Sequence, residues 1–380
     1  MIGTRETAPT RGGQITPEFK STNGIQLRAR VAICGAGGAP SEGVIYSLKK
    51  TGRFEVLGFG ADRSDLLGSI ADDRYLIPYA RDRDYKAKLL DLIDKTKPDL
   101  IHFQNDLEVL MASEFRQEIE SLGTKVFMPR HEVIETCTNK YLSYLKFRNA
   151  GLVVPKNVLL KDDAELSEVF EDLMDAEGRI WIRDSRVGGG GKGSLSTTSL
   201  AHAREWINAA DGWGHYLAAE HLTTSTVTWQ SLWSHGNLIA CQGRKRFGWV
   251  HGDRSASGVT GVTQVGETFS SKNLDELSRK AVFSVDSEPH GLYGVDFTVD
   301  KNRILNPTEI NISRFFTTIR FFTEAGLNMP EIFVNLGLGQ VVETSNGSIN
   351  PLEDGLLWLR GMDRSPVLSN RAAFEKAFNE

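Results

Sequence analysis

The chain has 380 residues, of which 40% are hydrophobic and 24% charged, a composition typical of a globular protein with two or three domains. A formal net charge of -5 gives no general electrostatic footprint for nucleic acid, so we expect no nucleic-acid partner. The cysteines, Cys34, Cys137 and Cys241, are far apart and lack metal-ligand spacing, which argues against a disulfide framework and a structural zinc site.

The first residues of the chain, 1–28, are polar and carry few large apolar side chains. This composition predicts a flexible leader, with a partner-binding arm as the alternative. The N-terminus lacks the apolar core of a signal peptide, and no apolar run is long enough to cross a bilayer. We therefore expect a cytoplasmic protein with no membrane partner.

From Ala29 onward, apolar strands alternate with helices. The pattern predicts helices at 41–50 and 84–95 and strands at 30–34, 54–59, 99–103 and 125–128. Alternation of this kind is typical of a parallel, doubly wound sheet, so residues 29–130 are predicted to form a Rossmann-like domain.

The glycine-rich turn after the first strand invites comparison with a dinucleotide-binding loop. Gly35 and Gly37 match the first two glycines of that fingerprint, but Pro40 replaces the third. We therefore favour a scaffold sheet over NAD binding. His102, Gln104 and Asp106 follow a strand at the carboxyl edge of this sheet, where ligands bind, and are candidates for substrate contact.

A second α/β segment follows. The pattern predicts a helix at 131–155 that carries Lys140, and later helices at 329–341 and 372–378. Strands are predicted at 179–183, 194–198, 216–222, 227–233 and 237–242, with a helix at 201–209 and further antiparallel strands up to residue 312.

A glycine-rich loop at 187–193 follows the strand that ends at Arg183. Without Cβ atoms, backbone N–H groups of Gly189, Gly190 and Gly191 can approach phosphates closely, and Lys192 can pair with phosphate oxygens. The loop does not match a Walker A motif. A surface hairpin tip is the alternative.

Two strands at 294–300 and 304–312 are joined by the polar turn 301–303. Alternation along the strands places Asp296 on one face of the first, and Glu309 and Asn311 on one face of the second. A hairpin would gather these oxygen ligands into a patch suited to Mg²⁺. Two solvated strand faces with ordinary surface acids are the alternative.

In combination, these motifs resemble the ATP-grasp superfamily, particularly the branch of the carbamoyl-phosphate-synthase large subunit and biotin carboxylase. The resemblance covers residues 30 to 340 and rests on the order of its parts. The parts are the Rossmann-like domain, the helix with Lys140, Arg183 with the glycine loop, the segment 220–222 and the Asp296–Asn311 hairpin.

The resemblance implies an α/β fold with a Rossmann-like pre-ATP-grasp domain at 29–130. An N-lobe with a glycine-rich lid would span 131–218, a C-lobe with the metal site 219–345, and a C-terminal cap 346–380.

The resemblance also implies roles for individual residues. Lys140 and Arg183 match the positions that hold ATP phosphates, with the lid residues Gly189, Gly190, Gly191 and Lys192 above them. The segment Glu220, His221 and Leu222 matches the one that recognises adenine. Asp296, Glu309 and Asn311 match ligands of one or two Mg²⁺ ions.

The basic residues Arg244 and Arg246 share one face of a strand. In the family such residues face the anionic substrate or the acylphosphate, and a solvated basic edge is the alternative. The family's Arg after the metal ligands comes one residue late here, so Arg314 is expected on the substrate side, with Ser313 as the alternative. Arg183 replaces the usual Lys, and Thr226 stands where many relatives have Glu.

The implied activity is that of an ATP-dependent carboxylate–amine or carboxylate–thiol ligase that forms an acylphosphate and releases ADP and phosphate. Its partners would be a small-molecule carboxylate and an amine-type nucleophile, and relatives are commonly homodimers. Two alternatives stay open, a nucleotide-binding regulatory protein without turnover and a kinase-like phosphotransferase.

Overall fold

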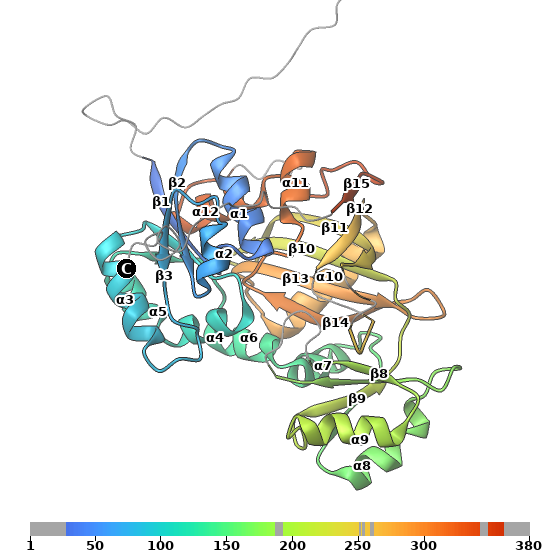
Figure 1. Cartoon of the computed structure of the whole chain (residues 1–380). Helices are drawn as coiled ribbons and strands as arrows, with labels where there is room; N and C mark the ends of the chain where they lie inside the picture. Colours follow the sequence, from blue (N-terminus) through green and yellow to red (C-terminus); the bar gives the residue numbers. More distant parts are fainter. Residues whose placement is uncertain are drawn as a thin grey trace, which may run out of the picture.

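The structure is a computed structural model that describes residues 28–186, 193–250, 252, 255–258, 262–342 and 349–360. The predicted leader, except Arg28, lies outside the described residues, as do most of the glycine loop and the predicted helix 372–378. The described chain forms three sheets with their helices (Figure 1). No helix in this part of the chain is long and apolar enough to span a membrane.

The first sheet has five parallel strands in the order β3-β2-β1-β4-β5. Its strands are β1 (Ala29–Cys34), β2 (Phe54–Gly60), β3 (Asp73–Leu76), β4 (Leu100–His102) and β5 (Lys125–Val126). This confirms the predicted parallel, doubly wound sheet. The strand order reverses between β1 and β4, so residues after these strands border the crevice where such sheets bind ligands.

Helices α1 (Ala39–Lys49), α2 (Arg63–Leu67), α3 (Tyr85–Thr96), α4 (Asp106–Glu114) and α5 (Arg116–Ser121) accompany this sheet. The sequence pattern did not predict β3, α2, α4 or α5. In α4 the core residues Val109 and Ala112 are joined by the half-buried Leu107, Leu110 and Met111, so apolar side chains surround the helix and the amphipathic period is lost.

The glycine turn after β1 is filled by the chain itself. Gly37 has φ of +89°, and a Cβ there would lie 2.1 Å from the backbone of Asp65. The Gly37 N–H donates to Glu42 Oε1 at 2.8 Å. Close packing thus accounts for this glycine, and its N–H is already occupied.

Residues 131–149 form two helices, so the single predicted helix 131–155 is wrong. Asn139 adopts an extended conformation (φ −101°, ψ 108°) between α6 (His131–Thr138) and α7 (Lys140–Asn149). Its Oδ1 accepts hydrogen bonds from the N–H groups of Tyr141 and Leu142, the arrangement of a helix N-cap. The break makes Lys140 the first residue of α7.

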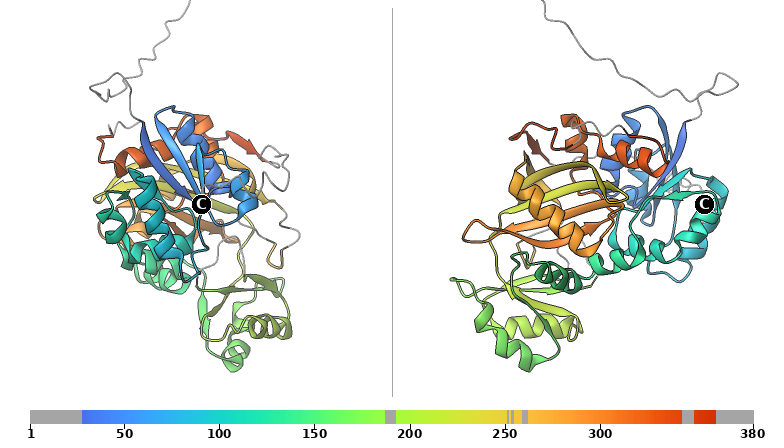
Figure 2. Two further views of the ribbon diagram at one scale, coloured as in Figure 1. Left: turned by 60° about the vertical axis from the view of Figure 1, so that its left-hand side comes forward. Right: turned by 180° about the vertical axis from the view of Figure 1, so that it is seen from behind.

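A small antiparallel lobe follows, with strand order β6-β9-β7-β8. It contains β6 (Asn157–Leu160), α8 (Asp163–Val169), the short 3₁₀ helix η1 (Glu171–Leu173), β7 (Ile180–Asp184), β8 (Leu195–Thr197), α9 (Leu200–Ala209) and β9 (Tyr216–Glu220). A separate apolar core, including Leu160, Ile182 and Ile207, holds it together. The lobe projects from the rest of the molecule (Figure 2).

The third sheet is antiparallel, with the order β14-β13-β10-β11-β12-β15. Its strands are β10 (Thr226–Ser234), β11 (Asn237–Trp249), β12 (Thr263–Phe269), β13 (Gly291–Val299), β14 (Leu305–Ile312) and β15 (Leu357–Leu359). The hairpin β13–β14 matches the predicted one. The accompanying helices are α10 (Lys272–Val285), α11 (Ile319–Ala325) and α12 (Met329–Gly337). α10 interrupts the predicted run of strands, and α12 ends before the predicted residue 341.

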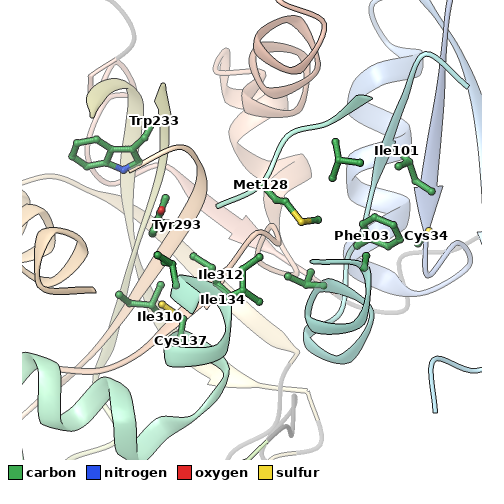
Figure 3. Packing of buried hydrophobic residues seen from close by; sticks show 14 of the residues in the cluster. Cys34, Ile101, Phe103, Met128, Ile134, Cys137, Trp233, Tyr293, Ile310 and Ile312 are labelled. Carbon is green, nitrogen blue, oxygen red and sulfur yellow. The ribbon is translucent and has the colours of Figure 1, made fainter. Parts of the chain in front are cut away.

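The parallel sheet and the six-stranded sheet share their apolar cores. One cluster joins Ile101 and Phe103 of the first unit to Tyr293 and Ile312 of the third sheet, through Met128 (Figure 3). Residues of α6, including Ile134 and Cys137, belong to the same cluster. The small lobe alone therefore has a core of its own among the described residues, and the predicted domain boundaries stay a prediction.

Candidate active site

A cleft of about 250 Å³ lies between the small lobe and the six-stranded sheet. It is bordered by β7 and β9 on one side and by β10, β11, β13 and β14 on the other. The described residues to which the resemblance assigns a place in the site line it: Lys140, Arg183, Glu220, His221, Leu222, Arg244, Arg246, Asp296, Glu309, Asn311 and Arg314. Gly189, Gly190, Gly191 and Lys192 lie outside the described residues.

Asp296 and Glu309 face each other across the β13–β14 hairpin as register partners. Their surroundings differ. Asp296 Oδ1 accepts a hydrogen bond from the Thr228 hydroxyl at 2.5 Å, and its Oδ2 accepts one from Asn311 Nδ2 at 3.0 Å. The Glu309 carboxylate has no hydrogen-bond or ion-pair partner among the described residues. Glu309 is therefore the cleft acid that is free to take a ligand.

Asn311 is engaged on both ends of its amide. Its Nδ2 donates to Asp296, and its Oδ1 accepts a hydrogen bond from Arg314 Nη2. In this arrangement the amide oxygen that a metal would need points to a guanidinium. Metal binding by Asn311 stays a prediction.

The basic pair Lys140 and Arg183 comes from α7 and β7. Burial lowers the pKa of Lys140 and of Arg183. In both cases the nearby Glu309 carboxylate acts in the opposite direction and raises the pKa. Arg183 Nε is buried with no hydrogen-bond partner in the described structure. Such an unsatisfied donor beside a cleft is suited to an anionic ligand.

Arg314 reaches the cleft because the backbone turns at Ser313. Ser313 has φ of +54°, a left-handed conformation, and is only 2% exposed. Asn311 and Arg314 consequently face the same cleft, although residues three apart in a regular strand point to opposite faces. Because of this turn, Arg314 reaches the cleft although it comes one residue later in the sequence than the resemblance predicts. Ser313 itself does not line the cleft.

Arg314 also joins the cleft to the parallel sheet. Its Nε donates to Asp106 Oδ1 at the start of α4. The other residues expected at that edge, His102 and Gln104, are buried and hydrogen-bonded to each other, and Gln104 holds the backbone of Phe315. Those two therefore serve packing, because neither reaches the cleft.

Arg244 and Arg246 lie on β11 at the end of the cleft beyond Asp296. Arg246 Nη2 is 3.6 Å from Asp296 Oδ1. Arg244 is 1% exposed, and its guanidinium stacks on Phe316 at 4.5 Å from the ring centroid. Buried Nε atoms of both arginines and Nε1 of Trp249 have no hydrogen-bond partner in the described part of the chain.

The segment after β9 forms the other end of the cleft. Glu220 Oε2 accepts a hydrogen bond from the Lys156 N–H at 2.7 Å, and His221 Nδ1 lies 2.9 Å from Asp175 Oδ2. Burial lowers the pKa of His221. Trp181 and Thr226 line the same end, and the Thr226 hydroxyl is buried without a partner among the described residues.

Three residues at this site escaped the sequence analysis. Trp181 and Trp249 line the cleft, and the buried Thr228 donates a hydrogen bond to the cleft acid Asp296. Thr228 could have been found from strand register, because it is the register partner of both Arg244 and Asp296. No local signal marks Trp181 or Trp249, since an aromatic residue on a strand is usually core.

The cleft residues fit a magnesium-bound nucleotide in chemical terms. No group of three or more His, Cys, Asp or Glu side chains is arranged for metal binding in the described chain, so a metal here would depend mainly on two carboxylates. Carboxylate oxygens suit Mg²⁺, which usually takes its remaining ligands from water and phosphate. The unpartnered Glu309 carboxylate could supply a metal ligand, and the unsatisfied Arg183 donor could hold a phosphate oxygen.

Comparisons with known proteins agree with this architecture. No family model and no curated protein sequence matches the chain. Several solved structures, however, are similar to the chain. Carboxyaminoimidazole ribonucleotide synthase from Aspergillus clavatus, complexed with ATP, is similar with a TM-score of 0.66 and 15% identity over 88% of this chain and 82% of that one.

The biotin carboxylase domain of Hydrogenobacter thermophilus 2-oxoglutarate carboxylase, in complex with MgADP, ADP and bicarbonate, gives a TM-score of 0.66 and 17% identity over 86% and 73% of the two chains. An L-amino acid ligase from Bacillus licheniformis gives a TM-score of 0.61 and 12% identity over 83% of this chain and 75% of that one. These likenesses show that the chain has the fold of these enzymes, the ATP-grasp fold. The predicted fold class is confirmed.

Proposed function

We propose that this protein is an ATP-dependent ligase that joins a carboxylate to an amine, with a thiol as the alternative nucleophile. The observation that carries the proposal is the pair Asp296 and Glu309, register partners in a cleft that also contains Lys140, Arg183, Arg246 and Arg314. Acids that can hold a metal, surrounded by cations that can hold phosphates, are what phosphoryl transfer from ATP requires. The structural likeness to ATP-bound and ADP-bound enzymes supports it.

The proposed reaction has two steps. A carboxylate oxygen of the substrate attacks the γ-phosphorus of ATP, the bond to the β,γ-bridging oxygen breaks, and ADP leaves. The nucleophile then attacks the acylphosphate carbonyl, the carbon–oxygen bond to phosphate breaks, and the amine proton is lost to solvent or base. The products are an amide, ADP and phosphate.

The proposed roles follow from position in the cleft. Lys140 and Arg183 would bind phosphate oxygens, with the glycine loop and Lys192 above them. Glu220, His221 and Leu222 would border the nucleobase. Mg²⁺, held by Glu309 and Asp296, would neutralise phosphate charge when bound. Arg246 and Arg314 would orient the substrate carboxylate.

The proposed setting of this reaction is the cytoplasm, with a small-molecule carboxylate and an amine-type nucleophile as partners and no nucleic acid or membrane. One similar biotin carboxylase domain is described as a dimer, which supports a homodimer as part of the proposal.

The test is ADP release by the purified protein with Mg-ATP and hydroxylamine, across a panel of small carboxylic acids. Hydroxylamine captures an acylphosphate as a hydroxamate, so carboxylate-dependent ADP release with hydroxamate would support the ligase. A stable phosphorylated product without hydroxamate would favour the phosphotransferase. Nucleotide binding without turnover on any acid would favour the regulatory alternative.

The matched variant is Glu309→Ala. We expect turnover to fall at least 100-fold, because the unpartnered carboxylate would be a principal metal ligand, while the unfolding midpoint changes little. Turnover near the wild-type rate in this variant would contradict the proposed metal site.

A further inference from the structure

Four side chains stand in register across the six-stranded sheet. Arg244 on β11 is the register partner of Thr228 on β10, Thr228 is the partner of Asp296 on β13, and Asp296 is the partner of Glu309 on β14. Directly opposed residues of antiparallel strands point to the same face. The row therefore leads from a buried arginine to the two cleft acids.

The hydrogen bonds along the row have a defined direction. The Thr228 hydroxyl accepts one hydrogen bond from Arg244 Nη2 at 3.0 Å and another from Arg246 Nη2 at 3.2 Å. A guanidinium can only donate, and a hydroxyl has two lone pairs and one hydrogen. Because both lone pairs are occupied, the hydroxyl hydrogen is left to point at Asp296 Oδ1, 2.5 Å away.

Arg244 is held independently of any ligand. Its Nη1 donates to the hydroxyls of Thr263 and Thr318, and its face stacks on Phe316. The described chain gives it no direct carboxylate partner. Burial, together with the neighbouring Arg246, lowers the pKa of Arg244 to about 9, so the side chain is still charged at neutral pH.

We propose that Arg244 and Thr228 are positioning residues that aim the Asp296 carboxylate at the metal. Arg244 polarises and orients the Thr228 hydroxyl, which holds Oδ1, while Asn311 holds Oδ2 from the other side. With both oxygens fixed, the remaining lone pairs of Asp296 are presented to the cleft. This inference rests on the proposed function, since it assumes that Asp296 binds the metal of a nucleotide complex.

The inference differs from the role in which Arg244 contacts the substrate carboxylate. In that role, replacing Arg244 would affect carboxylate binding and leave metal binding alone. In the positioning role, metal affinity would fall even when no carboxylate is present. Metal binding without substrate therefore separates the two.

The experiment measures Mn²⁺ binding in the presence of ADP and in the absence of any carboxylate, by the electron paramagnetic resonance signal of free Mn²⁺. Thr228→Val removes the hydroxyl and retains the side-chain shape. We expect about tenfold weaker Mn²⁺ binding, the lower range for loss of a group that orients a metal ligand. Thr228→Ser, which retains the hydroxyl, is expected to bind within about twofold of wild type.

Thr124→Val is the matched control. Thr124 and Thr228 are both 1% exposed, and Thr124 donates one hydrogen bond to the Pro98 carbonyl, far from the cleft. The same loss of a buried hydroxyl should leave Mn²⁺ affinity unchanged. If Thr124→Val weakens Mn²⁺ binding as much as Thr228→Val does, a general loss of stability explains the effect and the inference is overturned.

Arg244→Lys provides a second, independent variant. A single ammonium cannot reach Thr228 while also holding Thr263 and Thr318, so Mn²⁺ affinity should again fall several-fold. If Thr228→Val binds Mn²⁺ with wild-type affinity, the inference is overturned while the proposed function stands. If Thr228→Val does not fold, wild-type Mn²⁺ affinity in Arg244→Lys has the same meaning. Wild-type protein that binds no Mn-ADP would overturn both.

Discussion

At the scale of single residues, the same chemical group takes different roles according to its neighbours. Asp296 and Glu309 are both cleft carboxylates, yet the first is fixed by Thr228 and Asn311 and the second is free. Glu108 is a third acid, 4% exposed in the first turn of α4, where the Tyr85 hydroxyl donates to it at 3.4 Å. Burial raises the pKa of Glu108 to about 7.

This raised pKa predicts a pH dependence of stability. Between pH 4.5, the ordinary pKa of Glu, and pH 7, the folded state holds a proton that the unfolded state has lost, so the free energy of unfolding falls as pH rises. Glu108→Gln removes the titration. As the pH rises from 4.5 to 8, we expect the free energy of unfolding of the variant to increase relative to that of wild type by up to about 3 kcal/mol.

The measurement is urea unfolding of both proteins at several pH values from 4.5 to 8. The difference between the two proteins isolates Glu108 from other groups, such as His102, whose pKa burial lowers to about 4. A difference that stays constant across this range would contradict the prediction.

At the scale of secondary structure, the break between α6 and α7 determines where Lys140 lies. Asn139 caps α7 through Tyr141 and Leu142, and the Lys140 N–H donates to the Ser185 carbonyl at 2.7 Å. One continuous helix, as the sequence suggested, would rotate Lys140 away from this place. The cap thus connects helix stability to the proposed phosphate site.

Asn139→Ala should therefore have two effects. Loss of the cap should lower the free energy of unfolding by about 1 kcal/mol. Affinity for ADP should fall several-fold, because the first turn of α7 frays and Lys140 is no longer held. Urea unfolding and titration calorimetry measure the two effects. Asn139→Asp, which retains a capping oxygen, is the control, and unchanged ADP affinity in Asn139→Ala would separate the cap from the site.

At the scale of the whole molecule, the parallel sheet and the six-stranded sheet pack as one body. Gly337, the last residue of α12, touches the parallel sheet, where a Cβ would lie 2.2 Å from Leu100 Cδ1 and 2.9 Å from Phe127 Cβ. Leu100 is fully buried, so it has little room to move. The Asp106–Arg314 ion pair joins the same two units at the cleft.

Gly337→Ala tests this packing, because two effects have opposite signs. Helix propensity favours Ala by about 1 kcal/mol, whereas overpacking in a tight core costs about 1–3 kcal/mol. We expect net destabilisation in urea unfolding. The cost should shrink when Leu100→Ala provides space in the double variant. A stabilised Gly337→Ala protein would show that the two sheets are not tightly packed here.

Local rules were sufficient for much of the fold and the candidate site. Alternation along β13 and β14 placed Asp296 and Glu309 on one face, because a strand with one buried side leaves a polar residue at every second position. The alternation of apolar strands with helices from Ala29 predicted the parallel sheet, because parallel strands need a connecting segment such as a helix between them. Such patterns depend on backbone geometry within a few residues.

Contacts between distant segments required the tertiary structure. Asp106 and Arg314 are separated by 208 residues, and no local pattern pairs them. The burial of Arg244, the direction of the Thr228 hydroxyl and the packing of Gly37 against Asp65 depend likewise on which strands and loops become neighbours. Periodicity shows which face of an element is polar, but only the assembled sheets decide which polar groups meet there.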